Sequence, residues 1–326
     1  MTMRGEPLFD PLSHARRGPG KPDHLSPAQL EQIERTVRRT PEVMVKVLPK
    51  GSNSLKSVKN HLAYVSRHGK VDLVTDDGEI LHGKEIPDQL MTDWDLELDS
   101  LRDKSDLTAS KTSAKLVHKV LFSMPPGTNP ARVLSATRNF CREEFGLKHR
   151  YVMALHTDEP HPHVHVIVKA MNEQVERLHI RKQTLRHWRA QFAHRLREAG
   201  VAANATERAV RGVGRSSPKD GVYRASLRGD SLYVRKQVQA VAEAMVAGRA
   251  VRSETDKSRL LKTRDAVRRG WQAVANRLLS EGERKLAAEV VEFASGLAPP
   301  LTTREQIAQS LQEVAGAPLR RDKVRQ

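Results

Sequence analysis

The chain has few of the residues that stabilise secreted or aromatic-rich folds. Its 326 residues include one cysteine, Cys141, and aromatic side chains make up only 4%. A single thiol forms neither an internal disulfide nor a cysteine-rich zinc site, and it suits a reducing compartment. So few aromatics argue against a large aromatic-rich sandwich and against binding of nucleic acid mainly by base stacking.

Long apolar runs are missing as well. No stretch reaches the roughly 18 uninterrupted apolar residues of a membrane-spanning helix, and the N-terminus lacks the apolar centre of a signal peptide. We therefore expect no membrane insertion and a location in the bacterial cytoplasm. With 38% hydrophobic residues, the chain can still bury one large core or two modest ones.

Basic residues are in excess, and they are unevenly distributed. The chain has 56 lysines and arginines against 39 acidic residues, a formal net charge of +17, which points to a polyanionic partner. Residues 71–106 contain 12 acidic and 3 basic residues, whereas residues 177–236 contain 15 basic and 4 acidic ones. Taken alone, the basic block is equally consistent with a solvated surface.

Strand and helix patterns follow one another along the first two thirds of the chain. Two of the strand patterns are joined by a polar turn of six residues, 157–162, so we expect them to pair antiparallel. This order predicts an α+β fold with an antiparallel sheet flanked by helices. The predicted strands are 43–48, 116–122, 150–156 and 163–170, and the predicted helices are 26–38, 54–67, 130–145 and 184–199.

Breaks in these patterns predict the domain organisation. Residues 1–42, rich in proline, glycine and charge, are expected to form a loosely attached arm, and residues 43–214 a folded domain. A glycine-containing linker is expected at 215–230, followed by a mainly helical C-terminal region at 231–326 whose role stays open between a DNA-contacting and a partner-binding module. For the acidic segment 71–106 we consider two roles, a helix packed on the far side of the sheet and a screen for the basic block.

The segment 156–168, HTDEPHPHVHVIV, is the most informative part of the sequence. On a strand, His163 and His165 project to one side while the alternating valines face the core. If the preceding strand folds back, His156 arrives opposite them and three nitrogens converge on one ion. Three neutral imidazoles leave a divalent cation its full charge and open positions, as a Lewis acid acting on a phosphodiester requires.

The alternative is a histidine-rich turn that only closes a hairpin, but His156 and the one-sided apolar alternation favour the metal site. His161 lies in the turn between two prolines and is ranked as a spare ligand or a phosphate contact. Asp158 has three readings: it orients a ligand ring, takes a proton from the nucleophile, or simply forms the turn.

Among four tyrosines, Tyr64 is the best candidate for a nucleophile. In the helix 54–67 the apolar stripe leaves Tyr64 to one side, near Asn60 and Arg67, so we expect it not to be a core aromatic. A guanidinium one turn away favours the charged form of a phenol. The competing interpretation is an ordinary surface tyrosine.

Three motifs in order resemble those of one family. They are NHLAYVSRHGK around Tyr64, KVLFSMPPGTNP with Ser123 at the end of a strand, and the histidine segment itself. Together with the helix 184–199 and the ATERAVRG that follows, they resemble the relaxases of the HUH endonuclease superfamily, in the plasmid mobilisation and T-DNA border endonuclease branch. The resemblance spans about residues 43–214.

The resemblance implies a fold and an activity. It implies a five-stranded antiparallel sheet flanked by helices, and attack by Tyr64 on a phosphodiester of single-stranded DNA at a transfer origin. It also implies that His156, His163 and His165 hold Mg²⁺ or Mn²⁺ and that Ser123 contacts DNA near the nick. The product would be a 5′-phosphotyrosyl adduct with a free 3′-OH, and the expected partners are relaxosome accessory proteins, a type IV coupling protein and a type IV secretion channel.

The basic block then becomes the expected track for the DNA backbone. We consider two alternatives: a replication initiator or transposase of the same superfamily, against which the order of tyrosine before histidines argues, and a non-catalytic DNA-binding protein with a structural metal hairpin. Pro160, His161 and Lys169 depart from the residues that relatives often carry. The residues expected to bind DNA are Ser123, Arg67, Arg181, Lys182, Arg186 and Arg189.

Overall fold

The computed structural model describes residues 24–48, 52–105, 114–213, 229, 231–249 and 254–316. These residues fall into two compact units, one formed by residues 38–205 and the other by residues 24–37 together with those from 206 onward. Residues 1–23 of the predicted arm and the predicted linker, apart from Gly229, lie outside the described residues.

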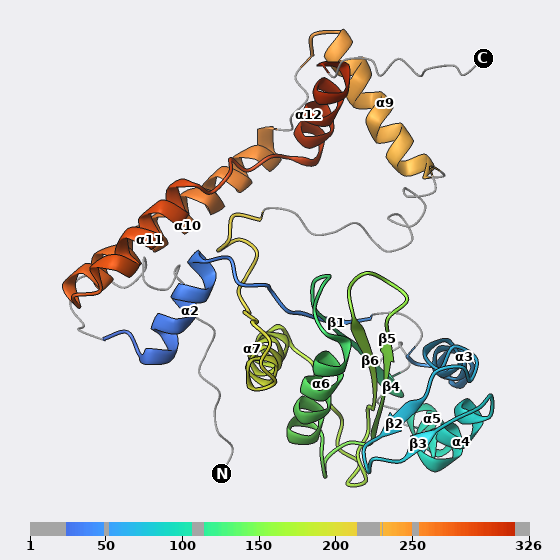
Figure 1. The fold of residues 1–326 in the computed structure, drawn as a ribbon. Helices are drawn as coiled ribbons and strands as arrows, with labels where there is room; N and C mark the ends of the chain where they lie inside the picture. The colour runs from blue at the N-terminus through green and yellow to red at the C-terminus, as the bar shows by residue number, and fades with distance from the viewer. Residues whose placement is uncertain are drawn as a thin grey trace, which may run out of the picture. The chain divides into compact units, whose positions relative to one another are not determined.

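The first unit is an antiparallel sheet with helices on both faces (Figure 1). In the described part of the unit the strand order is β1-β4-β6-β5-β2-β3. Helices α6 (Pro130–Glu144) and α7 (Lys182–Glu198) cover one face, and α3 (Leu55–Val65), α4 (Ile86–Asp93) and α5 (Leu96–Ser105) cover the other. The strands are β1 (Met44–Val47), β2 (Leu73–Thr75), β3 (Ile80–Leu81), β4 (Val117–Ser123), β5 (Tyr151–His156) and β6 (His163–Lys169).

The described sheet has six strands where five were expected. The residue pattern placed four of the six, and the other two form the short hairpin β2–β3, which lies inside the acidic segment and which the pattern of apolar residues did not reveal. Gly78 at the turn has φ +93, a conformation that glycine adopts without strain. Strands of three and two residues carry too little alternation to be distinguished from a loop.

The alternation along β6 decides which side chains face which layer. Val164, Val166 and Val168 pack in the core beneath α6 and α7. His163 and His165 therefore point to the opposite face, the one that α3 covers, where Ile167 joins the second core of the unit. Both strands of the β5–β6 hairpin thus place their histidines on the same face of the sheet.

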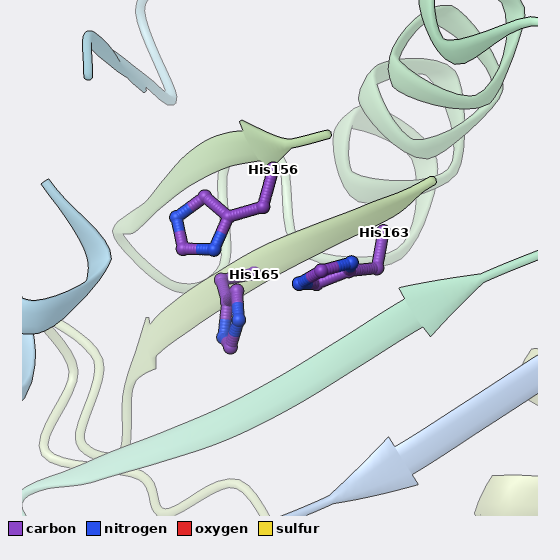
Figure 2. Close-up of side chains that lie close together, drawn as sticks. All are labelled: His156, His163 and His165. Atoms are coloured by element: carbon purple, nitrogen blue, oxygen red, sulfur yellow. The ribbon is translucent and has the colours of Figure 1, made fainter. Parts of the chain in front are cut away.

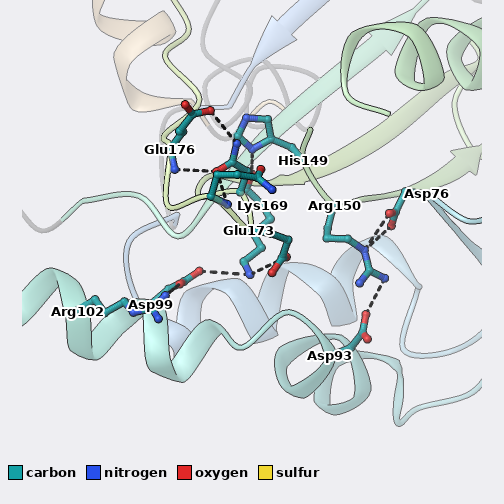
Figure 3. Close-up of polar contacts among 11 residues, drawn as sticks. Asp76, Asp93, Asp99, Arg102, His149, Arg150, Lys169, Glu173 and Glu176 are labelled. Carbon is teal, nitrogen blue, oxygen red and sulfur yellow. Dashed lines mark hydrogen bonds and ion pairs between the residues drawn. The ribbon is translucent and has the colours of Figure 1, made fainter. Parts of the chain in front are cut away.

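The acidic segment 71–106 is part of this second layer. Its helices α4 and α5 bury Ile86, Leu90 and Trp94 against α3 and the sheet. Its carboxylates meet cations at the far end of the β5–β6 hairpin (Figure 3). Arg150 lies 2.9 Å from Asp76 and 3.0 Å from Asp93, and Lys169 lies 3.7 Å from both Asp99 and Glu173.

Helix α3 begins with a side-chain cap and ends in a tight turn. The Ser54 hydroxyl accepts a hydrogen bond from the Ser57 amide at the start, and Val58 and Leu62 are buried. After the helix the chain passes through positive φ values at Arg67, His68 and Gly69. A Cβ on Gly69 would come within 2.3 Å of the Gly83 backbone, so only glycine fits there.

The second unit is helical. Its core gathers Ile33, Trp271 and Phe293, and the indole Nε1 of Trp271 donates to the carbonyl of Val210 at 3.0 Å. Residues 27–37 and 206–213, which the sequence pattern assigned to the arm and to the first domain, contribute to this unit. Its described helices are α2 (Pro27–Val37), α9 (Leu232–Val246), α10 (Glu254–Ser280), α11 (Arg284–Ser295) and α12 (Thr303–Gly316). Among the described helices, none is long and apolar enough to span a membrane.

Candidate metal centre and nucleophile

Three histidines from the ends of β5 and β6 converge on one point (Figure 2). The ring centroids of His156 and His165 are 4.6 Å apart, and that of His163 lies 5.3 Å and 5.4 Å from them. One ring nitrogen from each residue lies within 4.8 Å of the others. The antiparallel register explains this, because His156 pairs directly with His163 while His165 follows two residues later on the same face.

Hydrogen bonds to backbone carbonyls orient two of the three rings. His156 Nε2 lies 2.8 Å from the carbonyl oxygen of Val65, at the C-terminal end of α3, where helix carbonyls lack partners within the helix. His163 Nδ1 lies 3.2 Å from the carbonyl of His161. In each case the bonded nitrogen must donate its proton, which leaves the lone pair on the other nitrogen for a metal ion.

The chemistry of the donor set fits a divalent cation. Burial lowers the pKa of His156, although its hydrogen bond to Val65 acts in the opposite direction. Burial, followed by the proximity of His156 and His163, lowers the pKa of His165 to about 3. Neutral imidazole is the form that binds metals, so these rings are ready to act as ligands at neutral pH.

Tyr64 lies beside this cluster on α3. Its side chain is 38% exposed, and its ring centroid lies 5.9 Å from that of His165 and 6.3 Å from that of His156. The tyrosine is therefore off the apolar face of the helix, as the spacing predicted. A phenol at this place is open to a solvent-borne substrate while it adjoins the candidate metal ligands.

Arg67 contacts the nucleophile candidate, a ligand and a carboxylate at once. Its guanidinium lies 4.9 Å above the ring of Tyr64, 3.2 Å from Nδ1 of His156 and 2.5 Å from Oδ2 of Asp158. Partial burial alone would raise the pKa of Asp158, but the hydrogen bond and charge of Arg67 outweigh it and the pKa is lowered. In this conformation Asp158 is a counter-ion and a weak base.

The part of the chain that carries the three histidines matches a known protein family. Residues 77–201 match the relaxase family described as MobA/VirD2-like, nuclease domain. The chain carries a MobA/VirD2-like relaxase nuclease domain. The matched residues include the three histidines, Asp158 and Ser123, whereas Tyr64 and Arg67 precede them.

Curated relatives of this relaxase domain are T-DNA border endonucleases VirD2. The protein from Rhizobium radiobacter is 29% identical over 189 residues, and that from Rhizobium rhizogenes is 27% identical over 198 residues. These alignments cover 53% of this chain and 43% and 42% of the two relatives. The chain therefore spans less than half the length of the curated relatives it matches.

A solved structure described as "Molecular Basis of Vancomycin Resistance Transfer in Staphylococcus aureus" contains a chain similar to part of this one. The alignment covers 52% of this chain and 99% of that chain, with 11% identity and a TM-score of 0.33. A TM-score of this size does not establish a shared fold.

The sequence pattern did not single out one residue of the candidate site. His61 stacks on Tyr64 with ring centroids 5.9 Å apart and lies 6.1 Å from His165. Burial, then the charges of Lys119 and His156, lower the pKa of His61 to about 4, and its Nε2 is buried without a hydrogen-bond partner in the described structure. Its position three residues before Tyr64, on the same side of the helix, was the available signal.

Ser123 and His161 lie near the cluster in supporting roles. Ser123 pairs with His163 across the sheet, is 2% exposed, and its hydroxyl donates to the carbonyl of Pro162 at 3.1 Å. Its contact with DNA stays a prediction. The side chain of His161 lies 2.9 Å from Glu159, its ring centroid lies 5.9 Å from that of His163, and its carbonyl accepts the hydrogen bond from His163.

The cations predicted to track DNA lie on the other side of the relaxase sheet. Trp188 and Phe192 of α7 pack on the face formed by the valines of β6, whereas the histidines project to the α3 face. Residues at the start of α7 are exposed there, and their contact with DNA stays a prediction. They are Arg181, Lys182, Arg186 and Arg189, the last of which is half-buried.

Proposed function

We propose that this chain is a metal-dependent relaxase that nicks one strand of DNA through a covalent tyrosyl intermediate. The observation that carries the proposal is the exposed Tyr64 ring, 5.9 Å from the ring of His165 in a cluster of three converging imidazoles. The match of residues 77–201 to the relaxase nuclease family supports it.

Three side chains would hold the cation: His156 through Nδ1, His163 through Nε2, and His165. Mg²⁺ or Mn²⁺ bound there would polarise a phosphodiester and offset the charge that develops during its cleavage. The protein's own part is to keep the rings of His156 and His165 neutral by burial, and to fix the orientation of His156 and His163 through the carbonyls of Val65 and His161.

The proposed reaction exchanges one phosphodiester for another. The Tyr64 oxygen attacks phosphorus, the bond from phosphorus to the 3′ oxygen breaks, and the downstream strand becomes a 5′-phosphotyrosyl adduct. The phenol loses one proton and the leaving 3′ oxygen gains one, so a free 3′-OH can reverse the step without ATP. Asp158 is the proposed acceptor of the phenol proton, and it becomes a stronger base when Arg67 is drawn away from it.

A role in DNA transfer follows from the relatives. They are named as T-DNA border endonucleases. We propose that this chain recognises a single-stranded transfer origin, acts in the bacterial cytoplasm with relaxosome accessory proteins and a type IV coupling protein, and accompanies the DNA through a type IV secretion channel. A strand held open is required because a paired duplex restricts in-line attack at the scissile phosphate.

The test is the formation of a covalent adduct. The full chain is incubated with Mg²⁺ and single-stranded oligonucleotides that contain a randomised stretch and a 3′ fluorophore, which stays with the fragment attached to tyrosine. Fluorescent protein that survives denaturant is isolated, and its DNA is sequenced to define the origin. We expect Tyr64→Phe to abolish the adduct and chelation with EDTA to prevent it.

A matched control is Tyr233→Phe, which removes an exposed phenol from the helical unit. It should leave the amount of adduct unchanged. An adduct that persists in Tyr64→Phe would show that Tyr64 is not the nucleophile. Metal binding without any adduct, from any sequence in the pool, would instead favour a DNA-binding protein with a structural metal hairpin.

A further inference from the structure

The hydrogen bond of His156 to Val65 leaves one ring nitrogen for a metal ion, and that nitrogen already contacts the Arg67 guanidinium. Because Nε2 lies 2.8 Å from the Val65 carbonyl, it carries the proton, and the lone pair of the ring is on Nδ1. The Arg67 guanidinium lies 3.2 Å from this Nδ1. A guanidinium has only donors, so it occupies the lone pair that a cation would need.

Arg67 is held in this position from two other sides. Its same terminal nitrogen contacts Asp158 at 2.5 Å, and its carbon lies 4.9 Å above the Tyr64 ring. Its backbone has φ 51, so the turn after α3 directs the side chain back toward the cluster. The Arg67 side chain is 30% exposed and therefore has solvent into which it can move.

We propose that Arg67 competes with the metal ion for His156 and must be displaced before the cluster can bind a cation. While the guanidinium contacts Nδ1, its positive charge takes the place of an ion beside His156. On metal binding the guanidinium leaves Nδ1, both because the lone pair is needed and because two cations repel each other. This inference rests on the metal site of the proposed function, and it adds that the site is closed by its own side chain.

The test measures metal affinity rather than cleavage. Binding of Mn²⁺ to the DNA-free chain is followed by the electron paramagnetic resonance signal of the free ion at pH 7.5. The variant is Arg67→Asn, because asparagine tolerates the positive φ at this position. We expect Mn²⁺ to bind on the order of tenfold more tightly, since the variant removes a charged hydrogen bond that competes with the ion.

Two controls separate this inference from simpler ones. Lys70→Asn removes the same charge from an exposed residue of the same turn and should change the affinity less than about twofold, because exposed charges are screened by solvent. An equal gain in Lys70→Asn would show a general charge effect and overturn the proposal, as would unchanged or weaker binding in Arg67→Asn. The double variant His163→Ala and His165→Ala should not bind Mn²⁺; binding at wild-type affinity would reject the metal site itself, and the proposed function with it.

A second measurement follows Arg67 directly. Nuclear magnetic resonance of the arginine guanidinium groups, with the Arg67 signal assigned by its loss in Arg67→Asn, is recorded during titration with diamagnetic Mg²⁺. We expect the Arg67 signal to move while that of Arg150, paired with Asp76 and Asp93, does not. An Arg67 signal that stays unchanged at saturating Mg²⁺ would show that the guanidinium is not displaced.

Discussion

The two ends of the β5–β6 hairpin carry polar side chains on the same face and use them in opposite ways. At one end His156, His163 and His165 converge, and one ring nitrogen from each lies within 4.8 Å of the others. At the other end Arg150 and Lys169 meet the carboxylates of the acidic segment (Figure 3). Between the two ends the same face is apolar and belongs to the core beneath α3.

The difference shows how one hairpin can place a candidate metal site at one end and stabilising ion pairs at the other. Cations and carboxylates in contact satisfy each other, so the far end has little capacity left for a ligand. Imidazole nitrogens that converge without a carboxylate among them can instead hold a cation. The acidic segment thus contributes its charge to the end of the sheet away from the histidines, where part of the chain's basic excess is neutralised.

The largest expected effect comes from breaking the histidine end. His165→Ala should slow adduct formation on the order of a thousandfold, because a bound cation contributes several kcal/mol to transition-state stabilisation. Lys169→Met, four residues along the same strand, should leave the rate per folded molecule unchanged. Adduct kinetics on denaturing gels measure both, and equal losses in the two variants would contradict a division between the ends.

A smaller effect is expected from breaking the paired end. Lys169 and Asp99 have side chains only 6% and 5% exposed. Lys169→Ala removes the buried partner of Asp99 and leaves the carboxylate with Arg102, 3.7 Å away and half-exposed, so it should lower the free energy of unfolding by about 3 kcal/mol. Urea denaturation followed by the fluorescence of the buried Trp94 and Trp188 measures this.

Two further variants serve as controls for the buried pair. Replacing both partners, Lys169→Met with Asp99→Leu, should recover most of the loss because no charge is then left buried. The exposed pair of Lys59 and Asp88 joins α3 to α4, and Lys59→Ala should cost less than about 1 kcal/mol. A cost for Lys59→Ala as large as that for Lys169→Ala would mean that burial does not set the strength of these pairs.

The smallest effect concerns protonation at the paired end. His118 pairs with Val168 on β6 and is buried, and its Nε2 donates a hydrogen bond to the Leu178 carbonyl at 2.9 Å. Burial, then the charge of Lys115, lowers the pKa of His118 from 6.5 to about 4. Between pH 6.5 and about 4, His118 is therefore protonated in the unfolded chain but not in the folded chain. The contribution of His118 to the free energy of unfolding is fully present above pH 6.5 and is lost as the pH falls toward 4.

The loss should reach about 2 kcal/mol by roughly pH 5, at 1.36 kcal/mol for each unit. His118→Gln keeps a hydrogen-bonding side chain but does not titrate, so its stability should fall less over the same range. Denaturation curves measured at several pH values give both slopes. Parallel slopes in the two proteins would show that His118 does not contribute to acid sensitivity.

Local patterns were sufficient for the elements that carry the site. Alternation in HVHVIVK predicted β6 and the side of the sheet on which His163 and His165 lie, and helical spacing predicted that Tyr64 is off the core. The hairpin β2–β3 was not predicted because its strands are short. His61 was not predicted because its spacing of three residues from Tyr64 is the one local signal that marks it.

The charge pattern located a basic run in the sequence but did not show where in the fold its side chains lie. Arg181, Lys182 and their neighbours form a basic run, but a run of residues does not reveal on which face of a sheet its helix packs. The apolar stripe of Trp188 and Phe192 places α7 over the valines of β6, opposite the histidines. Arg150 and Lys169, in contrast, found carboxylates far away in the sequence.

By itself the sequence determined the residue types and their periodicity, and with them the strand that aligns two histidines, the third histidine across the turn, and the resemblance to relaxases. Only the tertiary structure decided the tautomer of His156, through the Val65 carbonyl, and the contact of Arg67 with the nitrogen that remains. The physical reason is range: alternation acts over neighbouring residues, whereas hydrogen bonds and charges act between segments that approach each other only after the sheet has formed.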